Sequence, residues 1–140
     1  MKNPPPKDKQ RDKLYRAEDK TFIKDRNLSK ECIERFVDKV VNSEWFKDKF
    51  KQSGRKLNLK LKFGRKNLTY SYQRSNCITI AQFQYTKRIC CHEISHFLIR
   101  GGEHHGANFA ACYLECVKEF LGINKHNKLK SEFIKNGVEF

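Results

Sequence analysis

Four of the chain's five histidines lie within fourteen consecutive residues, from position 92 to position 105. The stretch HEISH at positions 92–96 fits the pattern H-E-x-x-H. On a helix, residues four apart point the same way, so His92 and His96 can present two imidazole nitrogens to one metal ion. Glu93 lies beside that pair and can take a proton from a metal-bound water. The pattern predicts a hydrolytic Zn²⁺ site.

Catalytic zinc usually has three protein ligands and a water, so a third ligand is needed. A metzincin would require glycine at position 99 and histidine at position 102; Ile99 and Gly102 exclude that class. A gluzincin would take a glutamate from the next helix. The candidates are Glu103, His104, His105, Glu115 and Glu119.

The residues after the motif favour His105 as the third ligand. Gly101-Gly102 is expected to end the helix and reverse the chain, and the eight residues between His96 and His105 give ample reach for the return. Neighbouring residues usually point in different directions, so His104 and His105 are not expected to bind one ion together. Phe109, one turn into the next helix, can anchor that helix in the core. The other candidates remain alternatives.

H-E-x-x-H followed closely by H-G-x-x-F, at positions 105–109, resembles the short zincins of the SprT/Spartan type. In those proteins the second-motif histidine completes the zinc site, so the resemblance also selects His105. The chain is similar, too, to a family of small zinc metallohydrolases inferred in actinobacteria and their phages. That similarity implies a fold and a metal site but no established reaction. It rests on Gln10-Arg11, Tyr15, residues 17–19, HEISH, HGANF and residues 113–122.

The helices that must position these residues are indicated by apolar side chains spaced three and four apart. The active helix is expected to begin after Thr86 and to end at Gly101-Gly102. Ser29 is the expected N-cap of an earlier helix, which Asn42-Ser43 breaks. Further helices are expected within residues 8–23, at 107–121 with Gly122 as terminator, and at 127–136.

Between positions 56 and 81 apolar residues recur at every second position rather than every third or fourth. This alternation is typical of strands. Strands are expected at 56–63, 68–73 and 77–81, joined by turns as a three-stranded antiparallel meander. Together with the helices, this predicts an α+β, zincin-like domain. Since a zincin substrate can pair with an edge strand beside the active helix, residues 77–81 are expected to be that edge.

At 140 residues the chain has the size of one domain, expected over residues 8–140 after a flexible, proline-containing lead-in at 1–7. The sequence contains no run of about 18 apolar residues, which a membrane-spanning helix would need. Its N-terminus also lacks the apolar region of a signal peptide. We therefore expect a soluble, cytoplasmic protein. Its six cysteines are expected to be free thiols.

The chain is strongly basic, with 30 Lys and Arg against 16 Asp and Glu, a formal net charge of +14. Residues 51–74 carry eight basic residues and no acid. A surface of one sign attracts polyanions, although a solvated, solubilising face explains it as well. The candidates for binding DNA or RNA are Lys60, Lys62, Arg65, Lys66, Tyr70 and Tyr72.

Two functions are consistent with these patterns. The first is zinc-dependent hydrolysis, most naturally of a peptide bond in a polypeptide substrate, with Glu93 as general base. The pattern does not separate a peptidase from another amide hydrolase. The second is a basic nucleic-acid-binding module whose zinc site is structural or vestigial. A protease recruited to DNA would combine both.

Overall fold

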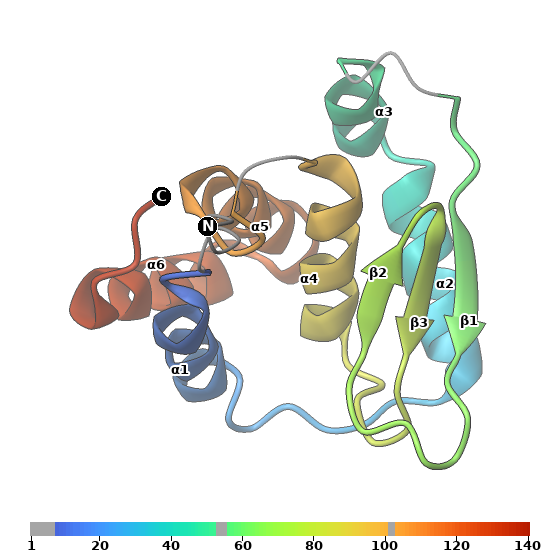
Figure 1. Cartoon of the computed structure of the whole chain (residues 1–140), viewed down its shortest axis with the longest axis horizontal. Coiled ribbons are helices and arrows are strands. Elements are labelled where there is room, and N and C mark those ends of the chain that lie inside the picture. Colours follow the sequence, from blue (N-terminus) through green and yellow to red (C-terminus); the bar gives the residue numbers. More distant parts are fainter. Residues whose placement is uncertain (1–7, 53–55, 101–102) are drawn as a thin grey trace, which may run out of the picture. The chain divides into compact units, whose positions relative to one another are not determined.

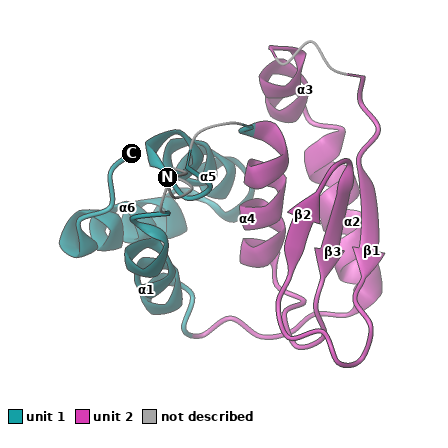
Figure 2. Cartoon of the chain, viewed as in Figure 1, with its two compact units in different colours: residues 1–23, 99–140 teal, residues 24–98 magenta. Residues whose placement is uncertain are grey.

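A computed structural model describes residues 8–52, 56–100 and 103–140 (Figure 1). Within them the chain is α+β, with six helices and a small three-stranded sheet. It divides into two compact units, residues 1–23 with 99–140, and residues 24–98 (Figure 2). The expected single domain over residues 8–140 stays a prediction. The expected lead-in at 1–7 and the stop at Gly101-Gly102 lie outside the described residues.

Unit 1 contains three helices, α1 (Arg11–Thr21), α5 (Ala107–Leu121) and α6 (Ile123–Asn136). Helix α6 packs against both α1 and α5. Gly122 joins α5 to α6 with φ +98°, a backbone conformation that residues with a Cβ rarely adopt. The core of the unit is formed by Leu14, Ala17, Phe109, Ala110, Tyr113, Leu129 and Phe133.

Polar contacts hold the start of the chain to its end within unit 1. The side chain of Gln10 donates to the backbone oxygen of Glu139 at 3.1 Å and accepts from its backbone N–H at 2.9 Å. The buried carboxylate of Glu18 on α1 accepts a 2.9 Å hydrogen bond from Tyr113 on α5. These contacts place the N-terminal helix next to the segment that follows the H-E-x-x-H motif.

Unit 2 has three helices, α2 (Lys30–Val41), α3 (Glu44–Lys51) and α4 (Lys87–Leu98). Each begins after a hydroxyl residue that accepts a hydrogen bond from a backbone N–H three residues on, at 3.1–3.3 Å. These residues are Ser29, Ser43 and Thr86, so the expected caps at Ser29 and Thr86 are confirmed. The helix that bears the H-E-x-x-H motif is α4. No helix in the described part of the chain is long and apolar enough to cross a membrane.

The sheet of unit 2 consists of β1 (Lys60–Phe63), β2 (Tyr72–Arg74) and β3 (Cys77–Ile80), in the order β1-β3-β2. Strand β3 is antiparallel to β2 but parallel to β1, so the prediction of a wholly antiparallel meander was wrong. Only two residues join β2 to β3, which allows a hairpin. Eight residues separate β1 from β2, enough to carry the chain past β3.

This strand order also corrects the expected substrate edge. Residues 77–81 were expected to form an edge strand, but β3 is hydrogen-bonded on both sides. The edges are β1 and β2. All three strands are also shorter than predicted, because ladder pairing begins only at Lys60 and at Tyr72, and β3 ends at Ile80.

All six cysteines are free thiols, as expected. Cys90, Cys91, Cys112 and Cys116 are buried in α4 and α5, whereas Cys32 and Cys77 are partly exposed. Burial raises the pKa of the Cys90 thiol well above its usual range, so this side chain is an uncharged core residue at neutral pH.

Candidate metal centre

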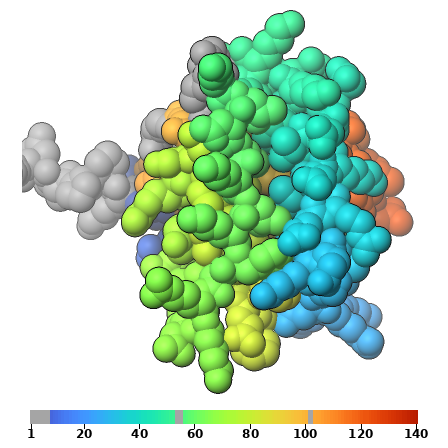
Figure 3. Space-filling model, turned by 90° about the vertical axis from the view of Figure 1, so that its right-hand side faces the viewer, coloured from blue at the N-terminus to red at the C-terminus, as the bar shows by residue number. Residues whose placement is uncertain are grey.

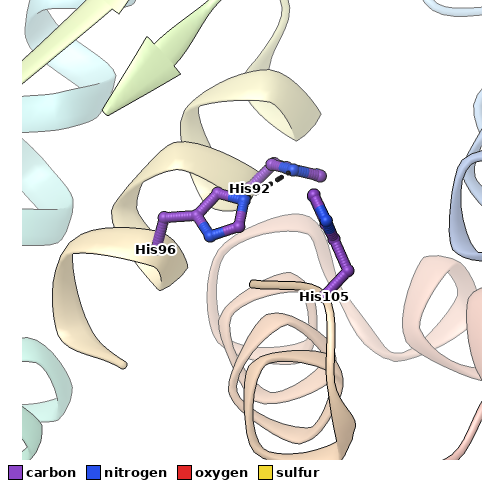
Figure 4. Close-up of side chains that lie close together, drawn as sticks. All are labelled: His92, His96 and His105. Atoms are coloured by element: carbon purple, nitrogen blue, oxygen red, sulfur yellow. Dashed lines mark hydrogen bonds between the residues drawn. The ribbon is translucent and has the colours of Figure 1, made fainter. Parts of the chain in front are cut away.

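Helix α4 brings two histidines of the motif together. His92 and His96 are one turn apart, and their Nε2 atoms lie 3.2 Å from each other (Figure 4). Nitrogens bound to a tetrahedral zinc ion at about 2.0–2.1 Å lie roughly 3.3 Å apart. The spacing of this pair therefore already fits a shared ion. His92 is only 5% exposed, and His96 is partly exposed.

Glu93 follows the first of these histidines on the same helix and is 5% exposed. One position along a helix turns a side chain by about 100°, so Glu93 does not share the direction of His92. Its carboxylate is not one of the clustered ligand groups. Glu93 thus directly follows His92 on α4 and lies outside the clustered ligand groups, and its role as general base stays a prediction.

His105 is held by a carboxylate from the N-terminal segment. One oxygen of Asp8 lies 2.5 Å from His105 Nδ1, and the other accepts the backbone N–H of His105 at 3.2 Å. With Nδ1 turned toward Asp8, Nε2 is the nitrogen left for a metal. The hydroxyl of Tyr15 lies 3.3 Å from that Nε2. The ring of Phe109 packs edge-on against His105, in keeping with its expected anchoring role.

His92, His96 and His105 form a group that could hold a metal ion. Each offers one ring nitrogen, and these three atoms lie within 4.8 Å of one another (Figure 4). His104, the neighbour of His105, is exposed, and so are Glu115 and Glu119 on α5. The group therefore contains the residue that the sequence favoured as the third ligand and none of its alternatives.

Sequence reasoning missed Asp8, which it did not consider for the site, and noticed Tyr15 only as part of a family resemblance. Both contact His105, from 97 and 90 residues away. No local sequence pattern predicts such a contact, because it arises from the packing of α1 with the C-terminal helices. An aspartate that supports a ligand histidine can be found only once the fold is known.

The residues predicted to bind nucleic acid all belong to unit 2. Lys60 and Lys62 are exposed on β1, and Arg65 and Lys66 are exposed in the segment that follows it. Tyr70 is 62% exposed, and Tyr72 on β2 is partly exposed.

No protein-family model matches this chain, and comparisons with curated proteins and with solved structures found no match. The resemblance to short zincins therefore rests on the two histidine motifs themselves.

Replacing Asp8 by asparagine is expected to weaken zinc binding by about 10- to 100-fold, because the amide cannot offer His105 two charged acceptor oxygens. Competition with a chromophoric chelator measures the affinity. The matched control is Asp12→Asn, since Asp12 lies on α1 with a highly exposed side chain. Equal zinc affinities for wild type and the Asp8 variant would show that this carboxylate does not support the site.

Proposed function

We propose that this protein is a zinc-dependent metallohydrolase with a minimal zincin-like site, acting on peptide bonds of polypeptides. The observation that carries the proposal is the convergence of three histidine nitrogens next to a glutamate on the helix that supplies two of them. Metal analysis and a hydrolysis assay test it.

The ligand chemistry favours zinc. Three neutral imidazoles suit Zn²⁺, and three protein ligands leave the fourth tetrahedral position open, as catalytic zinc sites require. A structural zinc site usually has four protein ligands, and the group in the described residues has three. The donor set therefore supports a catalytic rather than a structural ion.

Each residue has a distinct role in the proposed reaction. His92, His96 and His105 would hold the ion, which when bound polarises a carbonyl and lowers the pKa of a water molecule. Glu93 takes the proton of the attacking water and passes it to the leaving amine. Asp8 keeps the ring of His105 in the orientation that directs Nε2 away from the carboxylate.

The purified protein is expected to retain about one zinc per chain after supplementation with zinc and removal of the excess. It should cleave an unstructured protein, lose that activity to a chelator, and regain it when zinc is restored. Metal content is measured by elemental analysis and cleavage by the appearance of fragments. Absence of bound zinc after supplementation would contradict the proposal, and zinc binding without hydrolysis would contradict its enzymatic part.

A further inference from the structure

The pairing register of the sheet gathers basic and aromatic residues on one face. Directly paired residues of neighbouring strands project on the same side of a sheet, and so do alternate residues of one strand. One cross-strand row is Lys60, Cys77 and Arg74, and the next is Lys62, Thr79 and Tyr72. We call these six residues the basic face.

The opposite face of the sheet points into the core of unit 2. On the basic face Lys60, Lys62 and Arg74 are exposed, whereas Thr79 at its centre is only 7% exposed. Ile78 and Ile80 on β3 are fully buried, whereas Lys60 and Lys62 on β1 are exposed. The segment that contains β1, drawn in green, lies at the surface with no other element over it in Figure 3. The charged residues on the outer strands of the basic face are therefore open to solvent, whereas its centre at Thr79 is covered.

Aromatic rings and a guanidinium follow one another along the β2 side of this face. Tyr70, just before β2, has its ring centroid 5.9 Å from that of Tyr72. The guanidinium of Arg74 lies over the Tyr72 ring at 5.9 Å from its centroid. Tyr70 is 62% exposed, so its π-surface is open to a flat partner. This arrangement offers a place for base stacking.

The Lys, Arg, Asp and Glu side chains in the stretch of sequence that forms the sheet all belong to the basic types. Residues 49–92, which include the whole sheet, contain eleven Lys and Arg and no Asp or Glu. The strands therefore carry no carboxylate that could neutralise Lys60, Lys62 or Arg74. A groove or face of this kind raises the local concentration of polyanions. The partner is accordingly expected to be anionic and to carry exposed flat rings.

We propose that the basic face, together with Tyr70, binds single-stranded nucleic acid. Lys60 and Lys62 contact phosphates, while bases stack on the tyrosines at the β2 side. A duplex keeps its bases stacked within the helix and cannot offer them to these rings. This surface lies outside the histidine group, so the inference does not depend on zinc or on hydrolysis.

Fluorescence anisotropy with labelled oligonucleotides of about 15 nucleotides tests this, because a comparable length covers one single-strand binding site. The probes are oligo-dT, oligo-U and a DNA duplex of mixed sequence. Tyr72→Ala should weaken single-strand binding by about 5- to 150-fold, the range for loss of one stacked base. Tyr72→Phe keeps the ring and should bind like wild type. Lys62→Gln should reduce the slope of log affinity against log salt by about 0.7.

Lys130→Gln on α6 is the charge control and should leave both affinity and slope unchanged, since this exposed lysine belongs neither to the sheet nor to the segments that flank its strands. Circular dichroism checks that each variant is folded. Should Tyr72→Ala fail to fold, Lys60→Gln with Lys62→Gln, two exposed changes, tests the same face by the loss of affinity and slope. Tighter binding of either DNA or RNA single strands than of duplex supports the proposal and identifies the polymer.

The proposal is overturned if no probe binds at low salt. It is also overturned if duplex binds as tightly as single strands and Tyr72→Ala has no effect, because general charge attraction would then explain the binding. Zinc content and cleavage of an unstructured protein are measured on the same variants. The face substitutions should change neither, so a failure of this inference is distinguishable from a failure of the proposed hydrolase function.

Discussion

Glu93→Gln is expected to retain the bound zinc and to lose hydrolysis by about 10²- to 10⁴-fold, the range that general base catalysis contributes. Glutamine has nearly the same shape as glutamate, so the 5% exposed position on α4 should accept it without repacking. Its amide cannot take a proton from water. The change thus separates proton transfer from metal binding, because Glu93 is not one of the three clustered ligands.

The experiment pairs zinc content with the initial rate of cleavage of an unstructured protein, for wild type and variant at equal zinc loading. Glu34→Gln is the control, since Glu34 is exposed on α2 and lies outside the histidine group. It should match wild type in both measurements. Equal cleavage rates for wild type and Glu93→Gln would refute the assigned mechanism, and loss of zinc in the variant would instead make Glu93 a part of the metal site.

The helices could be predicted closely because their signals are local. Ser29 and Thr86 cap the helices that were expected to follow them, and the helix over 107–121 was predicted with its observed bounds. The start of α6 was placed at 127 rather than at Ile123. Gly122 is both the C-cap of α5 and the N-cap of α6. A glycine that ends one helix does not by itself predict that another helix begins at the next residue.

The sheet shows where local patterns stop being informative. Alternation correctly assigned the two faces of β1, since Lys60 and Lys62 are more exposed than Leu61 and Phe63. It could not assign partners, because alternation fixes which side chains share a face but not which strand lies alongside. The parallel pairing of β1 with β3 depends on the path of the long connection before β2.

The candidate site divides in the same way. The pair His92 and His96 follows from helical periodicity, and their nitrogens do lie 3.2 Å apart. The support of His105 by Asp8 joins residues 97 positions apart. It exists because the N-terminal segment packs with the C-terminal helices, and no spacing rule connects the two. Motifs thus indicate metal ligands, whereas the residues that orient those ligands require the fold.

His105→Ala is expected to weaken zinc binding by at least about 100-fold, more than the loss of a supporting carboxylate costs. The reason is that His105 supplies one of the three clustered nitrogens, and its Nδ1 is already turned toward Asp8. His104→Ala should keep near-stoichiometric zinc, because His104 is exposed and outside the group. Both substitutions replace a histidine by alanine at adjacent positions, so His104→Ala is the matched control for His105→Ala.

Titration with zinc in the presence of a chromophoric chelator measures both affinities, and circular dichroism of the metal-free proteins shows whether either variant has lost its fold. A folded His105→Ala protein that binds zinc poorly would support the ligand assignment. The reverse order of affinities would transfer the assignment to His104. Full zinc affinity in both variants would point to Glu115 or Glu119, the carboxylates of α5 that a gluzincin-like site would use.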